Sequence, residues 1–286
     1  MSGLKTYSPL RYPGGKNILS KYIIKLIEAN NLNGCTYIEP YTGGGAVALK
    51  LLIDGIVDHI IINDYDRSIY AFWYSVLNYT DELCNLIQNI DINIDNWYKQ
   101  KEIQKNKDIE DILTLGFSTL FLNRTNRSGI IKAGVIGGLK QDGNYKLDCR
   151  FKKDDIIQKI KTIASHKEHI SLYNYDTLKL ILNIIPHIEN SKLIFFDPPY
   201  YKKGSSLYVN YYKHNDHLRL SNAIKNLKDV PWIVTYDNEP EIAEMYMDFR
   251  YKVYGIRYTA GKKYIGKEIM FYSDNLILND ELKIIP

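Results

Sequence analysis

Short apolar strands alternate with helices along much of this chain, and the first such unit restricts the fold more than any other feature. Residues 35–40 (CTYIEP) predict a strand that runs into the glycine turn TGGG. A helix over 46–54 and a buried strand at 59–64 (HIIIND) follow, and this second strand ends on Asp64. A strand, a glycine turn, a helix and a strand that ends on an acid are, in this order, typical of the nucleotide-binding half of a doubly wound sheet.

The alternation returns after a long interruption. A helix that begins at residue 154 leads to predicted strands at 170–174, 192–196 and 231–237, and the closing segments indicate an antiparallel hairpin. The interruption itself consists of a polar, helical stretch followed by a segment, 121–150, that is rich in Gly, Asn and basic residues. This last composition suits loops and a hairpin better than a core.

We therefore predict an α/β protein with a doubly wound, Rossmann-like sheet and one insertion. The sheet domain comprises residues 1–66 and 156–286, and the insertion, 67–155, is mainly helical and carries a hairpin. The chain has 286 residues, of which 45% are hydrophobic and 24% charged, so it is long and apolar enough to bury a core of this size.

Cysteine content and the length of the apolar segments exclude other classes of protein. Cys35, Cys84 and Cys149 are far apart and odd in number, which excludes a disulfide framework and a Cys-x-x-Cys metal site and fits a reducing compartment. No apolar run approaches the roughly 18 residues of a membrane span, and the first residues lack the apolar core of a signal peptide. We therefore expect a cytoplasmic protein that contacts no membrane.

The net charge of +4 is unevenly distributed along the chain. Residues 1–25 and 249–267 contain five and six Lys or Arg, respectively, and no Asp or Glu. Residues 121–153 contain eight Lys or Arg and two acids, so the rest of the chain is net acidic. Such segments can form a positive surface that attracts a polyanion, or they can be solvated side chains on unrelated faces.

The tetrapeptide Asp197-Pro198-Pro199-Tyr200 directly follows the apolar strand LIFF, where ligands of open α/β sheets bind. It suits group transfer to an exocyclic amine, because the Asp197 carboxylate and the Pro198 carbonyl can each accept one N–H and polarise the nitrogen. The prolines fix the backbone, and Tyr200 offers a ring on which a base can stack, worth about 1–3 kcal/mol. The alternative is a turn that merely ends a strand.

Three further motifs could line the same edge of the sheet. The segment EPYTGGG, from Glu39 to Gly45, allows close approach of the backbone to a ligand, although it matches GxGxxG poorly. Asp64 can accept hydrogen bonds from ribose hydroxyls, or it can simply end a strand. In the basic glycine turn RYPGGK, Lys16 could hold a carboxylate and Tyr12 could pack on a sulfonium, or the turn could only start a helix.

The four motifs, in this order, resemble the Dam-type family of adenine-specific DNA methyltransferases over nearly the whole chain. The resemblance implies a methyltransferase that uses S-adenosyl-L-methionine and releases S-adenosyl-L-homocysteine. It also implies that Asp197, Pro198, Pro199 and Tyr200 are the catalytic tetrapeptide. The cofactor-binding residues that it implies are Tyr12, Gly15, Lys16, Glu39, Tyr41, Gly43, Gly45, Asp64, Asp176 and Asp197, with Asn174 beside Asp176.

The basic segment of the insertion resembles the family's recognition hairpin, which enters the major groove. Arginine can pair with guanine and asparagine with adenine, whereas lysines on phosphates position the protein without specifying a sequence. The segment continues as SGIIKAGVIGG rather than in the family's NGxxRYN-like pattern, so no target sequence follows from it. The expected DNA-binding residues are Asn123, Arg124, Asn126, Arg127, Lys132, Lys140, Lys262 and Lys263.

We therefore expect a site-specific enzyme that methylates the 6-amino group of a flipped adenine in double-stranded DNA. The alternatives are another acceptor amine (the 4-amino group of cytosine, or an RNA adenine), a dinucleotide-binding oxidoreductase, and a catalytically silent DNA-binding module. No metal is expected, because the sequence contains no metal-ligand pattern. A cognate restriction endonuclease is a candidate partner, and we expect a monomer because a non-palindromic or hemimethylated site needs one copy.

Overall fold

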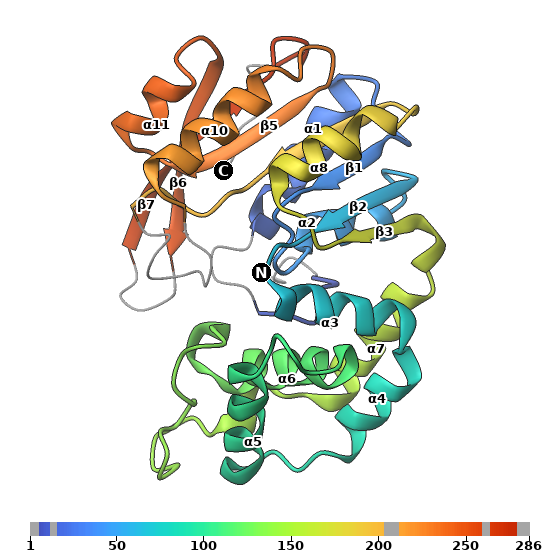
Figure 1. Ribbon diagram of the computed structural model, residues 1–286, viewed down its shortest axis with the longest axis vertical. Helices are drawn as coiled ribbons and strands as arrows, with labels where there is room; N and C mark the ends of the chain where they lie inside the picture. The colour runs from blue at the N-terminus through green and yellow to red at the C-terminus, as the bar shows by residue number, and fades with distance from the viewer. Residues whose placement is uncertain (1–5, 12–15, 203–211, 259–263, 279–286) are drawn as a thin grey trace. The chain divides into compact units, whose positions relative to one another are not determined.

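The computed structural model describes residues 6–11, 16–202, 212–258 and 264–278, which belong to two compact units (Figure 1). The described part of the first unit consists of residues 16–65 and of the chain from residue 169 onward. The second unit consists of residues 6–11 and 66–168.

The first unit is built on a seven-stranded sheet with the order β3-β2-β1-β4-β5-β7-β6. The first five strands of this order are parallel, whereas β7 runs antiparallel between β5 and β6. The strands are β1 (Thr36–Glu39), β2 (His59–Asn63), β3 (Ile170–Tyr173), β4 (Lys192–Phe196), β5 (Trp232–Asp237), β6 (Arg250–Tyr258) and β7 (Tyr264–Tyr272). The doubly wound α/β fold expected from the sequence is confirmed.

Helices cover both faces of this sheet, and its central strands are accordingly apolar. Every residue of β1 and of β5 is buried. The 3-10 helix η1 (Lys16–Leu19), α1 (Ser20–Ala29) and α2 (Ala46–Ile53) lie on one face. On the other face lie α8 (Thr177–Asn183), η5 (Ile185–His187), α10 (His214–Lys225) and α11 (Pro240–Met245), as Figure 1 shows.

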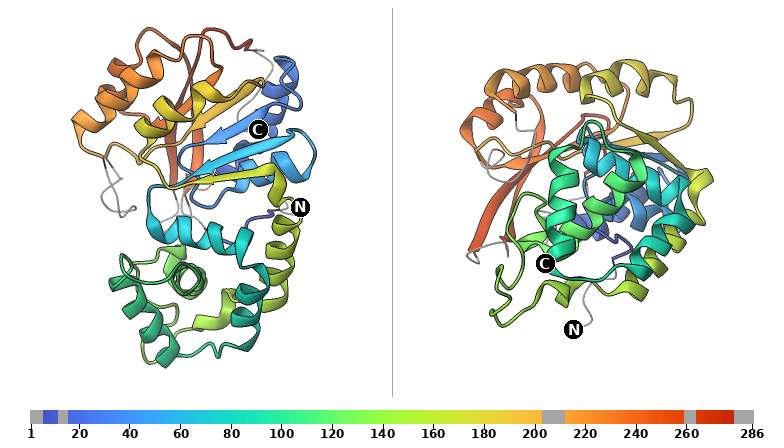
Figure 2. Two further views of the ribbon diagram at one scale, coloured as in Figure 1. Left: turned by 45° about the vertical axis from the view of Figure 1, so that its right-hand side comes forward. Right: turned by 60° about the horizontal axis from the view of Figure 1, so that its bottom comes forward.

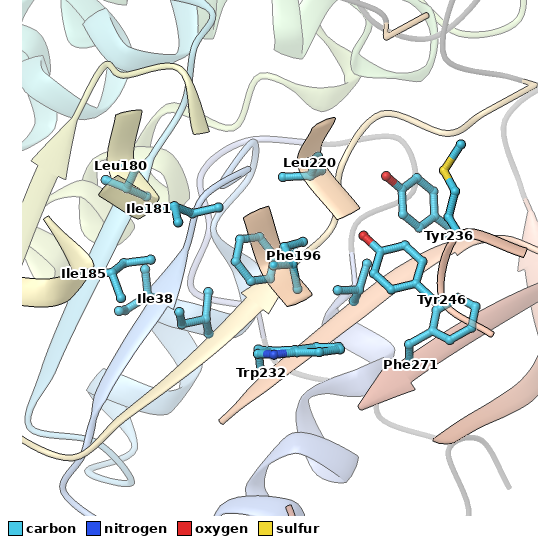
Figure 3. Close-up of a cluster of buried hydrophobic side chains, with 14 of the residues drawn as sticks. Ile38, Leu180, Ile181, Ile185, Phe196, Leu220, Trp232, Tyr236, Tyr246 and Phe271 are labelled. Carbon is cyan, nitrogen blue, oxygen red and sulfur yellow. The ribbon is translucent and has the colours of Figure 1, made fainter. Parts of the chain in front are cut away.

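The core under α8, α10 and α11 is one continuous cluster of apolar side chains (Figure 3). Phe196 of β4 and Trp232 of β5 lie at its centre, and Leu220 reaches it from α10. Tyr246, just after α11, stacks on Phe271 of β7 with the ring centroids 4.8 Å apart. This packing anchors the antiparallel end of the sheet to the parallel part.

The strand order reverses at β1, and this reversal defines where a ligand can bind. From β1 the chain moves outward to β2 and then β3, and it later returns on the opposite side of β1 to form β4 and β5. The carboxyl ends of β1 and β4 are therefore neighbours, with Ile38 opposite Ile194. Ligands of open α/β sheets bind at such a switch point.

The second unit is helical. Its helices are α3 (Arg67–Asn78), α4 (Thr80–Asn89), α5 (Ile94–Lys105), α6 (Ile112–Thr125) and α7 (Lys153–Ala164), with the short η2 (Arg127–Gly129) and η3 (Leu147–Arg150); η4 (Lys167–His169) follows at its end. The left view of Figure 2 shows α6 nearly end-on, in the middle of the other helices. Helix α6 crosses α3 closely at Gly116, where a Cβ atom would lie 2.5 Å from the Ala71 carbonyl oxygen.

The second unit extends beyond the predicted insertion of residues 67–155. Helix α7 belongs to it because Ile156, Ile160 and Ile163 form a buried face that packs on α4 and α3. The helix α6 also extends to Thr125, five residues into the segment predicted as loops, because Phe121 and Leu122 continue its apolar contacts. No helix of the described residues is long and apolar enough to cross a membrane.

The buried cluster under α10 predicts a contrast between two leucines of that helix. Leu220 is 1% exposed and Leu218 is 41% exposed. We expect Leu220→Ala to lower the free energy of unfolding by about 2–5 kcal/mol, because it leaves a cavity. Leu218→Ala is the matched control and should change it by less than about 0.5 kcal/mol. Urea unfolding followed by circular dichroism measures both, and equal effects would contradict the packing described here.

Candidate active site

Asp197-Pro198-Pro199-Tyr200 follows the carboxyl end of β4, next to the switch point. The two prolines and Tyr200 are buried, and the Asp197 side chain is 19% exposed. Oδ1 of Asp197 lies 2.9 Å from Nζ of Lys16 and accepts a 2.8 Å hydrogen bond from the Thr235 hydroxyl. Oδ1 is thus anchored by two partners, and among the described residues none hydrogen-bonds Oδ2.

The surroundings of Asp197 disfavour its charge. Burial raises the pKa of Asp197; the ammonium of Lys16 opposes this shift, and the carboxylate of Glu268 adds to it. Thr235, a fully buried residue of β5, stabilises the ionised form through its hydrogen bond. A carboxylate with a raised pKa binds a proton more readily than one in water.

Lys16 connects Asp197 to Tyr200. Its Nζ donates a 2.8 Å hydrogen bond to the Tyr200 hydroxyl and lies 4.9 Å from the centre of the Tyr200 ring. The Tyr200 hydroxyl in turn donates to Oε1 of Glu268, which is fully buried on β7. The sequence predicted Lys16 as a residue that holds a carboxylate; the carboxylates that it contacts here belong to the chain itself.

The glycine segment after β1 is tied to the end of β2. The Gly43 N–H donates to Oδ2 of Asp64 at 2.9 Å, and the backbone of Gly43 has a φ of 48°. Gly45 precedes α2 with a φ of 58°, a left-handed conformation that favours glycine. Asn63, buried at the end of β2, donates its amide to the Pro40 carbonyl at 2.9 Å. Hydrogen bonds therefore fix the glycine segment to the predicted ribose-binding acid, Asp64.

Three other predicted cofactor residues also make contacts within the protein. Oε1 of Glu39 accepts from the Ala48 N–H at the start of α2 at 3.1 Å, and burial raises the pKa of Glu39 to about 8. The Tyr41 hydroxyl shares a 2.9 Å hydrogen bond with that of Tyr212. Asp176 caps α8 through the N–H of Leu178.

Asn174, after β3, lies beside the other side of Asp64. Its amide donates to the Asp64 carbonyl at 2.7 Å, which joins the segments after β2 and β3. The segments after β1 and β2 are joined in a similar way by the bond from Gly43 to Asp64. Neighbouring carboxyl ends of β1, β2 and β3 thus present Glu39, Asp64 and Asn174 in one row. Carboxylates and amides in such a row suit the hydroxyls and ring nitrogens of a nucleoside.

Two of the expected DNA-reading residues are buried, which corrects the prediction for them. Asn123 is 1% exposed, accepts from the Arg11 N–H at 2.7 Å and donates to the Gly129 carbonyl. Asn126 is fully buried and accepts from the indole N–H of Trp97 at 2.7 Å. Both side chains hold the loop after α6, so neither can pair with a base edge in this conformation.

The expected hairpin of the insertion is a loop with one antiparallel bridge, between Asn126 and Val135. Arg127 is exposed on it. Arg124 is half-buried, and burial lowers the pKa of its guanidinium to about 10. Lys132 and Lys140 are exposed. The remaining predicted residues Tyr12, Gly15, Lys262 and Lys263 lie outside the described residues.

Glu268 and Thr235 are the site residues that the sequence did not predict. Each stands in a strand with an apolar pattern, Glu268 in KEIMFY and Thr235 in WIVTYD, where a buried polar residue must have a partner. The sequence could therefore have indicated that both residues have a polar partner, but not which residue that partner is. The described residues contain no group of three or more His, Cys, Asp or Glu side chains placed to hold a metal.

The doubly wound sheet, with the DPPY segment after β4 and an acid after β2, has the features that the sequence resemblance implied for an S-adenosylmethionine-dependent methyltransferase. The model of the D12 class N6 adenine-specific DNA methyltransferase family matches residues 12–259, and the chain belongs to this family. It is an adenine-specific DNA methyltransferase that uses S-adenosyl-L-methionine, and its substrate is DNA. The resemblance noted in the sequence is confirmed.

Among known proteins, the chain is similar to the Type II methyltransferase M.MjaIII of Methanocaldococcus jannaschii. The two are 26% identical over 239 residues, which cover 76% of this chain and 79% of the relative. Among solved structures, it is similar to the rRNA methyltransferase aviRa of Streptomyces viridochromogenes, with 8% identity, a TM-score of 0.39 and coverage of 91% and 84%. A SAM-dependent methyltransferase of Agrobacterium tumefaciens has 10% identity, a TM-score of 0.39 and coverage of 88% and 62%.

The buried carboxyl of Glu39 predicts a pH-dependent stability. Its pKa rises from 4.5 to about 8 on folding, so the wild-type protein loses stability as the pH rises from about 5 to 8. Glu39→Gln cannot ionise and keeps an oxygen for the Ala48 N–H. We expect the variant to gain roughly 1–4 kcal/mol relative to wild type between pH 5 and pH 8.

Urea unfolding at pH 5, 6.5 and 8 without cofactor measures this gain. Glu28→Gln, which removes an exposed carboxyl from α1, is the charge-matched control. Parallel pH curves for Glu39→Gln and wild type would show that Glu39 folds with an ordinary pKa.

Proposed function

We propose that Asp197, Pro198, Pro199 and Tyr200 form the catalytic centre for methylation of the 6-amino group of adenine. The observation that carries this proposal is the asymmetry of Asp197. Lys16 and Thr235 anchor Oδ1, and Oδ2 is left to accept a hydrogen bond from the amine. Because an amine inside a duplex cannot reach this carboxylate, the target adenine has to be flipped out of the DNA.

The residues after β1, β2 and β3 fit the cofactor. S-adenosyl-L-methionine supplies, when bound, a methyl group on a positively charged sulfur, which is activated without a metal. Asp64, held by the Gly43 N–H, is suited to accept from ribose hydroxyls, and Gly43 and Gly45 allow close approach of the backbone. Glu39 and Tyr41 line the loop beside them, and Asp176 follows β3.

At the proposed catalytic centre, acceptor groups of the protein polarise the amine of the target base. Oδ2 of Asp197 and the carbonyl oxygen of Pro198 each accept one N–H, which localises the lone pair on the nitrogen. The Tyr200 ring is 1% exposed, so the site has to open before the ring can stack on the base, a contact worth about 1–3 kcal/mol. The nitrogen would gain the methyl group as the bond between methyl and sulfur breaks, with the bonding pair left on the sulfur of S-adenosyl-L-homocysteine. The nitrogen would also lose one proton, which Asp197, with its raised pKa, is suited to receive.

We propose the second unit, the predicted insertion of residues 67–155 together with α7, as the target-recognition domain. Asn123 and Asn126 hold the loop after α6 in shape, and this leaves exposed Arg127 to read a base edge. Exposed Lys132 and Lys140 are suited to phosphates, which position the enzyme on the duplex.

We further propose that this enzyme is cytoplasmic and acts as a monomer in a restriction–modification system. The support is the relative from Methanocaldococcus jannaschii, whose name is that of a Type II methyltransferase. A cognate restriction endonuclease would then cut the same site when it is unmethylated.

Replacement of Asp197 tests the catalytic assignment. Asp197→Asn keeps the shape of the side chain. Its amide nitrogen, however, faces either Lys16 and Thr235 or the substrate amine, and it can donate to them but cannot accept from them. We expect methylation of unmethylated DNA to fall at least about 100-fold, because the amine loses its anionic acceptor. DNA affinity should change less than threefold. The measurement is transfer of labelled methyl groups, with mass spectrometry of the digested product, and wild-type activity in the variant would overturn the assignment.

Replacement of Arg127 and Lys140 separates base reading from phosphate contact. Arg127→Ala should reduce the discrimination between the target site and single-mismatch sites. The difference in activation free energy between the two kinds of site should fall by about 1–3 kcal/mol. Lys140→Ala should weaken binding to all DNA sites equally. The slope of log binding constant against log salt concentration should become smaller by about 1. Lys228→Ala, an exposed lysine of the first unit, is the control. If Arg127→Ala also weakened all sites equally, Arg127 would be a phosphate contact.

A further inference from the structure

Glu268 is a fully buried carboxyl group that the catalytic scheme above does not use. It stands on β7, opposite Asp237 of β5 and Tyr254 of β6. Oε1 accepts from the Tyr200 hydroxyl, and Oε2 accepts from the Tyr254 hydroxyl at 2.7 Å. A buried carboxylate is costly unless it is paired and hydrogen-bonded, so these contacts are a condition for keeping it there.

The same carboxyl group shares a cation with Asp197. Nζ of Lys16 lies 2.9 Å from Oδ1 of Asp197 and 3.8 Å from Oε2 of Glu268. Lys16 also donates to the Tyr200 hydroxyl, whose single proton goes to Glu268. The direction of these two bonds is fixed, because an ammonium can only donate and a carboxylate can only accept.

We propose that Glu268 is a positioning residue of the methyl transfer, which holds the phenol of Tyr200 and, together with Asp197, the ammonium of Lys16. It fixes the position of Tyr200 in the tetrapeptide and limits how strongly Lys16 binds Asp197. The inference rests on the proposed role of the Asp197–Tyr200 tetrapeptide. Its charge also acts on Asp197 directly, since Glu268 contributes to the raised pKa of that carboxyl.

The test is Glu268→Gln, which keeps the size of the side chain. An amide has one acceptor oxygen, so it cannot accept from both Tyr200 and Tyr254. We expect kcat to fall about 10- to 100-fold, with KM for S-adenosyl-L-methionine changed less than twofold. Removal of the negative charge lowers the pKa of Asp197, so the acid limb of the kcat profile should move to lower pH.

Two further variants separate positioning from a structural role. Tyr200→Phe keeps the ring and removes the hydroxyl that Glu268 holds, so it should lower kcat without moving the acid limb. The double variant should be only slightly slower than the slower single variant, because both changes break one link. Glu244→Gln removes an exposed carboxyl from α11 and should leave kcat and the pH profile unchanged.

The outcomes are distinct. A lower kcat with a shifted acid limb and non-additive effects supports the proposal. An unshifted limb, or losses that simply multiply in the double variant, overturns it and leaves Glu268 a structural residue. If Glu268→Gln does not fold, an unchanged kcat in Tyr200→Phe overturns it. Full activity of Asp197→Asn would instead remove the proposed catalytic centre itself, whatever Glu268 does.

Discussion

The buried ammonium of Lys16 is the charge around which the candidate active site is arranged. It is 5% exposed, and a cation so far from water is stable only beside compensating groups. Asp197 and Glu268 supply the negative charge, and the Tyr200 hydroxyl accepts a further bond. Because these residues come from η1, from the segment after β4 and from β7, the network joins parts of the chain that are distant in sequence.

This arrangement also connects the antiparallel end of the sheet to the candidate active site. Strand β7 lies beside β5, and it brings Glu268 into hydrogen-bonding contact with Tyr200 of the tetrapeptide that follows β4. Strand β5 contributes Thr235, which bonds Asp197, and Asp237, whose carboxylate accepts the N–H groups of Tyr201 and Lys202 directly after the tetrapeptide. The turn is therefore fixed by its own prolines and by two strands that carry no recognisable motif.

Much of the fold and the first contacts of the site could be predicted from the sequence. The strand, glycine turn and acid of residues 35–64 predicted the sheet, and the tetrapeptide after LIFF marked the switch point, because these features have a fixed spacing along the chain. Glu268 and Thr235 could not be predicted in the same way. Each stands alone in an apolar strand, and its role depends on which strands become neighbours, which local patterns do not determine.

The prediction that Asn123 and Asn126, at the carboxyl end of α6, contact DNA is wrong for a different reason. A polar residue in a basic, glycine-rich segment fits equally well a base reader and a residue that binds the loop's own backbone, because both roles use the same amide group. The structure decides between them by burial: Asn126 bonds Trp97 and the carbonyls of Ile130 and Ile131, which satisfies the amide inside the protein. Under the role proposed for this loop, sequence selection depends on side chains that such residues hold at the surface, and a change in Asn126 would alter it only indirectly, through the shape of the loop.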